Sequence, residues 1–135
     1  SYKGKDGSCH KCSGQVTIKS CYDVPSNNEL ALKKAVSLQP ISIAIEADQS
    51  QFQFYSKGIF SGKCGTKLDH GVLLVGYGEE DSQLYWLVKN SWGPSWGDKG
   101  YIKIARNDTE GQPGLCGIAM SPSYPVVEKK VTSFL

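Results

Sequence analysis

The stretch that decides the fold reads Asp69-His-Gly-Val-Leu-Leu-Val-Gly-Tyr-Gly78, and Leu84-Tyr-Trp-Leu-Val-Lys-Asn-Ser-Trp92 follows it. Branched and aromatic apolar residues dominate both segments, as is typical of β-strands. The cluster Gly78-Glu-Glu-Asp-Ser82 between them supplies turn-forming residues. We therefore predict an antiparallel hairpin with strands at residues 72–77 and 84–92.

This hairpin brings one histidine opposite one asparagine. If Tyr77 opposes Gln83, then His70 lies opposite Asn90 and both side chains point to the same face of the sheet. The asparagine oxygen would accept from one ring nitrogen and leave the other for a nucleophile or substrate, with Trp92 covering the pair. A slip of one residue in this register would separate the two side chains. The alternative is that His70 is a satisfied core histidine and Trp92 a core aromatic residue.

Shorter elements are expected on both sides of the hairpin. Ser26 and Glu29 fit a capping box that opens a helix over 30–36, and the alternating isoleucines of 41–45 predict a half-buried strand. Asp48 is expected to cap a short helix that carries Phe52 and Tyr55 and ends at Gly58. Further short strands are expected at 15–19 and 100–104. Residues 26–125 thus form one helix-flanked antiparallel sheet or barrel.

Composition excludes several classes of protein. The 135 residues carry 15 Lys and Arg against 13 Asp and Glu, a net charge of +2, and no basic block that would fit nucleic acid. No apolar run is long enough for a membrane-spanning helix. Five cysteines in so short a chain indicate an oxidising compartment, and the odd number leaves one thiol free or paired outside the chain. A metal site at Cys9-His-Lys-Cys12 with Cys21 is disfavoured, because no second Cys/His pair completes it.

The segment Asn90-Ser-Trp-Gly-Pro-Ser-Trp-Gly97, preceded by Asp69-His70, resembles the papain/cathepsin L family of cysteine proteases. Supporting matches include Gln39-Pro-Ile-Ser-Ile-Ala-Ile45, Gly62-x-Cys64-Gly and Cys116-Gly-Ile-Ala119. The resemblance implies an α+β, papain-like cysteine protease fold. Residues 26–125 would be mostly the right-hand antiparallel β-barrel domain with short flanking helices, 1–25 a remnant of the left, helical domain, and 126–135 a polar tail.

The resemblance also implies roles for individual residues. His70 matches the catalytic histidine, Asn90 the residue that orients it, and Trp92 the indole that shields their bond. Asp69 either accepts a bond from substrate backbone or nearby groups, or is solvated at a strand end. The main specificity pocket would be lined by small or apolar side chains, which favour an aliphatic or aromatic substrate residue over arginine: Ala44, Leu68, Gly71 and Ser121.

The cysteines and one asparagine carry further expectations. Cys64 and Cys116 resemble a family disulfide, whereas the family partner of Cys9 lies off-chain. Cys12 and Cys21 depart from the common pattern, and their nearness suggests a local bridge. Asn107-Asp-Thr109 is an N-glycosylation acceptor.

The family nucleophile has no counterpart in the sequence. In this family the histidine follows the nucleophilic cysteine by roughly 130–150 residues, so the nucleophile is expected about 60 or more residues before Ser1. We expect a cysteine endopeptidase of the secretory pathway, lysosome, vacuole or extracellular space, without metal or organic cofactor. Its partners would be protein or peptide substrates, the missing N-terminal segment, a propeptide and cystatin-like inhibitors. The alternatives are a non-enzymatic storage or binding homologue and a disulfide-stapled β domain with a structural His–Asn pair.

Overall fold

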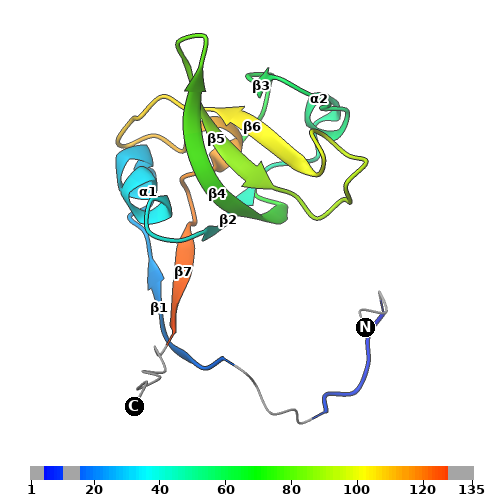
Figure 1. The fold of residues 1–135 in the computed structure, drawn as a ribbon, viewed down its shortest axis with the longest axis vertical. Coiled ribbons are helices and arrows are strands. Elements are labelled where there is room, and N and C mark those ends of the chain that lie inside the picture. The colour runs from blue at the N-terminus through cyan, green and yellow to red at the C-terminus, as the bar shows by residue number, and fades with distance from the viewer. Residues whose placement is uncertain (1–4, 11–15, 128–135) are drawn as a thin grey trace, which may run out of the picture.

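The computed structural model describes residues 5–10 and 16–127 of the chain. Its elements follow in the order β1 (Ile18–Asp23), α1 (Glu29–Val36), β2 (Ile41–Ile45), α2 (Ser50–Gln53), β3 (Ile59–Phe60), β4 (His70–Glu80), β5 (Gln83–Lys89), β6 (Tyr101–Ala105), the 3₁₀ helix η1 (Leu115–Gly117) and β7 (Ser123–Val127). The strands form one sheet in the order β1-β7-β2-β4-β5-β6-β3 (Figure 1). Only the β3–β6 pair is parallel among the strand pairs described. This is an α+β arrangement.

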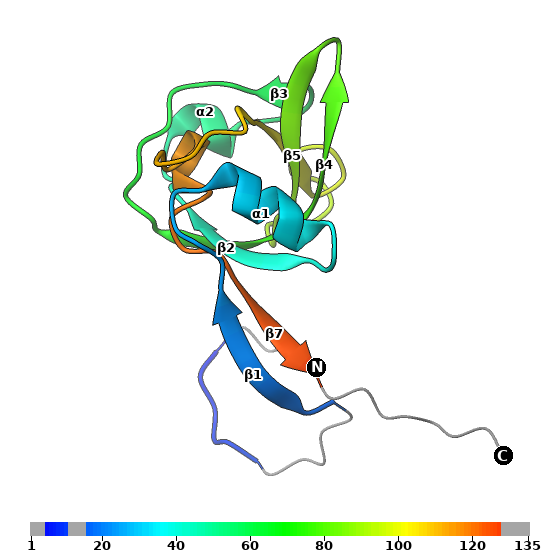
Figure 2. The same ribbon diagram turned by 90° about the vertical axis from the view of Figure 1, so that its left-hand side faces the viewer.

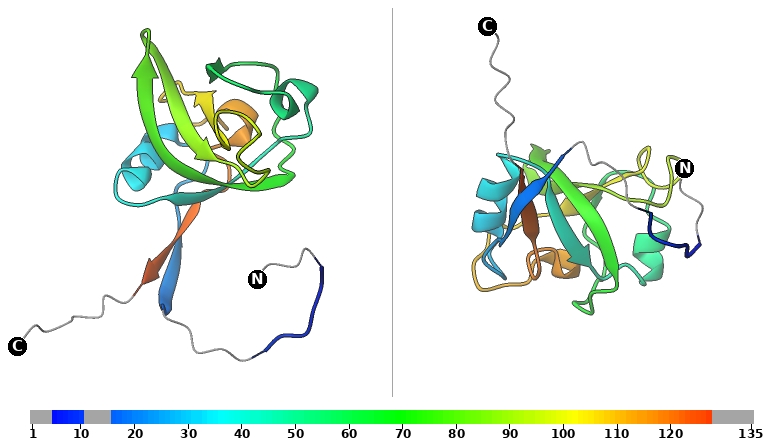
Figure 3. Two further views of the ribbon diagram at one scale, coloured as in Figure 1. Left: turned by 45° about the vertical axis from the view of Figure 1, so that its right-hand side comes forward. Right: turned by 90° about the horizontal axis from the view of Figure 1, so that it is seen from below.

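The sheet curves around a single core. The tip of the β4–β5 hairpin projects at one end, and the β1–β7 ribbon extends from the other (Figure 2). The two helices lie on different sides of the body, as both views of Figure 3 show. The alternating isoleucines of β2 enter the core together with Leu74, Trp86 and Ile102, all at most 2% exposed. Of the helices described, none is long and apolar enough to cross a membrane.

Helix α1 begins differently from the predicted capping box, which is wrong. Asn28 is the N-cap, and its side chain accepts from the Ala31 amide at 2.8 Å. Ser26 instead donates its hydroxyl to the Met120 carbonyl. Glu29 is fully buried and points into the protein rather than back to the helix start. Its position is decided by tertiary contacts, which a local capping motif does not contain.

The hairpin is confirmed, but its predicted register is wrong. Asp81 and Ser82 alone form the turn, both with positive φ, so Glu80 pairs with Gln83 and Tyr77 opposes Trp86. Farther from the turn Leu74 opposes Val88, because Val75 is an extra residue in β4. Without this bulge the side-chain alternation would place His70 and Asn90 on opposite faces. The bulge therefore aligns them.

Other boundaries also differ from the predictions. The strand at 41–45 is found with the predicted bounds. The first strand covers Ile18–Asp23 because it pairs with β7, a strand not predicted from the sequence. Asp48 does not cap α2; the N-cap is Gln49, which makes no capping bond with its side chain. β5 ends at Lys89, before Asn90 and Trp92.

The disulfide between Cys64 and Cys116 is confirmed. It joins the segment before β4 to η1. In the part of the chain that the structure describes, Cys9 and Cys21 are exposed free thiols. Cys12 lies outside the described residues, so the expected Cys12–Cys21 bridge and the disfavoured metal site stay predictions.

Candidate active site

His70 and Asn90 meet at one end of the curved sheet. His70 is the first residue of β4, and Asn90 directly follows β5 with its amide bonded to the Gly100 carbonyl at 2.9 Å. The His70 Nε2 atom lies 2.8 Å from Asn90 Oδ1. The same oxygen accepts from the Ser91 amide at 2.7 Å, which identifies it as the carbonyl oxygen. Nε2 therefore carries the proton, and Nδ1 is the nitrogen able to accept one.

Trp92 covers this pair on one side. Its ring stacks on the His70 ring with centroids 4.9 Å apart and an interplanar angle of 28°. Phe52 and Trp96 contact Trp92 edge-on at 5.8 and 5.1 Å. Trp96 Nε1 in turn donates to the Gln53 carbonyl of α2. Trp92 itself is 39% exposed, so the aromatic cluster holds the indole against the imidazole but leaves its outer face open to solvent.

Asp69 bonds within the protein in this structure. Its Oδ1 accepts from the Ala47 amide at 2.8 Å, and its own amide donates to the Ile45 carbonyl at 3.0 Å. Ile45 is the β2 partner of His70. Asp69 therefore fastens the start of β4 to the end of β2.

Glu46, a residue not predicted from the sequence to belong to the site, lies beside this contact. It is 6% exposed and accepts from the amides of Gly65 at 2.8 Å and Lys67 at 2.6 Å. The Lys67 and Gly65 bonds lower the pKa of Glu46, with Gln49 assisting, while burial and Asp69 act in the opposite direction. No signal in the strand pattern could have found it, because the alternation that buries Ile41, Ile43 and Ile45 predicts an exposed residue at 46.

The four expected pocket residues are only partly brought together. Ala44 and Gly71 are directly paired between β2 and β4, on the sheet face opposite the isoleucines of β2. Leu68 packs beside Gly117 of η1. Ser121 is exposed and lines a separate hollow with Asp23 and Pro25. No described contact joins Ser121 to the other three.

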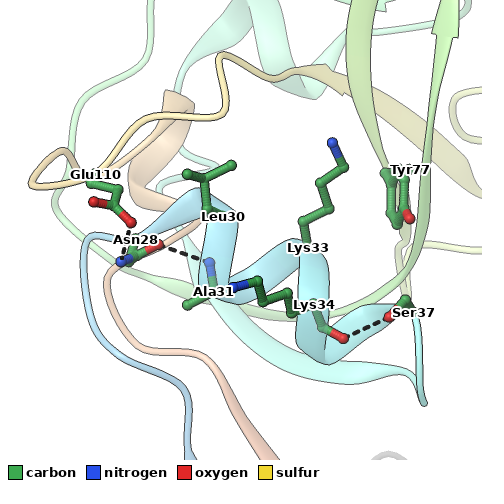
Figure 4. A pocket seen from close by; sticks show the side chains of 8 residues that line it. All are labelled: Asn28, Leu30, Ala31, Lys33, Lys34, Ser37, Tyr77 and Glu110. Carbon is green, nitrogen blue, oxygen red and sulfur yellow. Dashed lines mark hydrogen bonds between the residues drawn. The ribbon is translucent and has the colours of Figure 1, made fainter.

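Two further hollows lie on different parts of the surface. One, of about 380 Å³, lies beside the histidine site and is lined by residues including Ser42, Gly71 and Asn90. The other, of about 460 Å³, lies over α1 (Figure 4). Its polar side chains are largely engaged, since Lys33 pairs with Asp108 at 3.0 Å and Asn28 bonds Glu110 at 3.3 Å. It has no residue in common with the histidine site.

The glycosylation acceptor lies next to this second hollow. Asn107 is exposed, whereas Thr109 donates both its amide and its hydroxyl to Glu29. Burial works to raise the pKa of Asp108, but the bonds from Arg106 and Lys33 outweigh it and lower that pKa. The backbone of the triplet is thus fixed, with the asparagine side chain pointing outward.

The chain is similar in sequence to known cysteine proteases. Residues 1–126 match the family model described as papain family cysteine protease. Cysteine proteinase RD21A of Arabidopsis thaliana is 57% identical over 128 residues, covering 93% of this chain and 28% of the relative. The KDEL-tailed cysteine endopeptidase CEP2 of the same plant is 55% identical over 128 residues, covering 93% of this chain and 35% of the relative.

Solved structures agree with the sequence comparison. The bromelain protease from Ananas comosus in complex with the E64 inhibitor has a TM-score of 0.88 to this chain and 44% identity, over 94% of this chain and 60% of that one. The chain spans about a third of the length of the curated relatives it matches.

Proposed function

Because the chain belongs to the papain family of cysteine proteases, we propose that it supplies the histidine half of a peptide-cleaving site. The nucleophilic cysteine would come from a segment N-terminal to this chain. The observation that carries the proposal is the bond from His70 Nε2 to Asn90 Oδ1, which leaves Nδ1 able to accept a proton. Residues 1–25 would continue into the nucleophile-bearing half, and residues 26–125 would form the histidine-bearing half.

The chemistry follows from this tautomer. Nδ1 of His70 takes the thiol proton, and the thiolate attacks the peptide carbonyl carbon. The imidazolium returns its proton to the leaving amine as the carbon–nitrogen bond breaks, which leaves an acyl-thioester. Water, deprotonated by Nδ1, then releases the acid and regenerates the thiol. Asn90 is neutral and does not add a second negative charge beside the thiolate, so it orients the imidazolium without competing for its charge.

We propose Ala44, Leu68, Gly71 and Ser121 as the main specificity pocket, with Leu, Val or Phe preferred over Arg. Ala44 and Gly71 are adjacent in the sheet, next to His70, which supports this assignment. Ser121 is its least supported member, because no described contact joins it to the others. A peptide series that differs only at the residue before the scissile one tests the pocket, and a preference for Arg would refute it.

We further propose protein or peptide substrates, a propeptide and cystatin-like inhibitors as partners, and passage through the secretory pathway. The KDEL tail in the name of one relative is an endoplasmic-reticulum retention signal, which supports that route. The exposed Asn107 is the expected glycan site. Intact mass before and after deglycosylation, with Asn107→Gln as control, tests it; an unchanged wild-type mass would contradict it.

The proposed function is tested on the complete protein that contains this chain. His70→Ala should lower kcat/KM by at least roughly 10³-fold, because proton transfer and thiolate stabilisation are both lost. His10→Ala is the matched control, since His10 is exposed and far along the chain from β4, and it should retain activity. Wild-type protein that cleaves no peptide and takes no label from a thiol-directed, substrate-like inhibitor would instead favour a storage or binding homologue.

A further inference from the structure

The turn that leads into His70 is built around a single buried carboxylate. Glu46 directly follows Ile45, the residue that pairs with His70 across β2 and β4. Its two oxygens accept from different amides of the 64–69 loop, Gly65 through Oε1 and Lys67 through Oε2. No cation within the described residues forms an ion pair with Glu46. Its charge is therefore balanced by backbone dipoles of that loop and by the Gln49 side-chain amide, which donates to Oε1 at 3.0 Å.

The 64–69 loop also accepts a hydrogen bond from the segment that carries Glu46. Asp69, at the end of the same loop, accepts from the Ala47 amide, which follows Glu46. The Glu46 amide donates to the carbonyl of Cys116, which is joined by its disulfide to Cys64 at the start of the loop. The loop is thus held at three places. The disulfide to η1 fixes its beginning, Glu46 binds its middle, and Ile45 and Ala47 bind its end at Asp69. The chain leads from this loop directly into His70, the first residue of β4.

The space around the carboxylate is closed as well. A Cβ atom at Gly65 would lie 2.5 Å from Glu46 Oε2 and 2.7 Å from Oε1. Any side chain at Gly65 must therefore displace the carboxylate or the loop. This close approach gives a second way to disturb the contact without changing Glu46 itself.

We propose that Glu46 is a positioning residue for His70, acting through the 64–69 loop to keep the imidazole on Asn90. The inference rests on the proposed function, since it concerns the same histidine. A carboxylate suits this task because it offers two acceptor oxygens to two converging amides. Glutamine has one oxygen and one NH₂ group, so Glu46→Gln leaves one amide facing a donor and moves the loop.

Glu29 supplies a matched control. It is also buried and also accepts from two backbone amides, those of Asn107 and Thr109, but its loop does not lead to the histidine. Glu29→Gln and Glu46→Gln therefore create the same kind of chemical defect at different places. A purely structural role for Glu46 predicts that both variants lose stability and that neither changes kcat.

The experiment measures both variants, together with Glu46→Asp and Gly65→Ala, in the complete protein at a temperature where all remain folded. Glu46→Gln and Gly65→Ala should lower kcat by roughly 10- to 100-fold with a smaller change in KM, as misplaced catalytic groups do. Glu46→Asp keeps the charge on a shorter side chain and should retain more activity than Glu46→Gln. Glu29→Gln should keep the wild-type kcat.

A second readout does not depend on peptidase activity. In protein labelled with ¹⁵N at histidine, the proton on His70 Nε2, assigned by its loss in His70→Ala, reports the bond to Asn90. It should become exchange-broadened in Glu46→Gln and Gly65→Ala and stay sharp in Glu29→Gln. An inactive wild type would refute the proposed function, and this signal would still decide the role of Glu46. If the protein is active, a wild-type kcat in both Glu46→Gln and Gly65→Ala would overturn the inference. If the protein is inactive, an unchanged Nε2 signal in both variants would overturn it.

Discussion

Two buried glutamates, one at the start of helix α1 and one directly after strand β2, solve the same electrostatic problem with different consequences. Glu46 lies at the end of β2 and holds the loop that enters His70, whereas Glu29 opens α1 and holds the loop at 107–109. Glu29 also accepts from Trp86 Nε1 at 3.1 Å and from the Thr109 hydroxyl at 2.9 Å. In both cases backbone amides replace a counter-ion as partners of the charge.

The difference lies in what each loop carries. The loop bound by Glu46 is tied by the disulfide and leads into the proposed proton acceptor, His70. The loop bound by Glu29 carries the exposed Asn107 and the Arg106–Asp108 ion pair. A carboxylate that binds amides stabilises whichever loop supplies them, so the device itself is not a functional signature. We expect changes near Glu29 to affect stability alone, and changes near Glu46 to affect stability and activity together.

A large loss of stability without any loss of activity is expected on the Glu29 side. Arg106 has a side chain only 2% exposed, bonded to Asp108 and lying over the rings of Tyr77 and Trp86 at 5.2 and 5.3 Å. Arg106→Leu should lower the free energy of unfolding by about 3 kcal/mol, since it removes one partner of a buried ion pair. Urea unfolding measures this, and kcat should stay at the wild-type value.

Lys103→Leu is the control for that measurement, because the Lys103–Glu80 pair lies at the surface, where solvent screens the attraction, and should contribute little to stability. A loss of activity in Arg106→Leu at a temperature where it is folded would break the proposed division between the two regions.

The next effect concerns the disulfide on the Glu46 side. Replacing both Cys64 and Cys116 by Ala should lower the free energy of unfolding by about 2–4 kcal/mol, because the unfolded chain is no longer constrained. Unlike Arg106→Leu, it should also lower kcat, since the 64–69 loop loses its tie to η1. Unfolding and kinetics on the double variant measure both. If the double variant loses stability but keeps the wild-type kcat, the disulfide does not help to position His70, and the Glu46 contact alone does so.

These regions also differ in how far the sequence predicts them. The alternation of Ile41, Ile43 and Ile45 predicts β2 with its bounds, and the hairpin is predicted because strand propensity and turn residues are local properties. The pairing of His70 with Asn90 is also predicted, although the assumed register is wrong. It is recovered by the bulge at Val75, a feature of strand packing that leaves no mark in the local pattern.

The two glutamates could not be predicted in their roles. Glu29 fits a local capping box, and Glu46 falls on the face of β2 expected to be exposed, yet both side chains are buried. Their backbone partners are amides between 19 and 80 residues away along the chain. Every residue except proline offers such an amide, so the sequence carries no signal that one will be aimed at a carboxylate.

A smaller effect is expected at the start of α1, next to Glu29. Asn28→Ala removes the N-cap bond to the Ala31 amide and should cost about 1 kcal/mol of unfolding free energy. Ser37→Ala, at the other end of the same helix, removes an exposed hydroxyl bond to the Lys34 carbonyl and should cost less. Thermal melts rank the two variants, and kcat should be unchanged in both. An equal cost would mean that the capping bond contributes little here.

The smallest signal is expected in acid, and it isolates the charge on Glu46. The amides of Lys67 and Gly65 hold the pKa of Glu46 in the folded protein below its ordinary value of 4.5. The contribution of this carboxylate to stability is therefore complete above the unfolded pKa and is lost as the pH falls through the folded pKa. The protonated acid keeps only a carbonyl acceptor, much as glutamine does. The difference in unfolding free energy between wild type and Glu46→Gln should thus be constant between pH 6 and 7 and shrink below about pH 4.5. Urea unfolding across this range measures it, and a difference that stays constant or grows in acid would show that the shape of the side chain, not its charge, holds the loop.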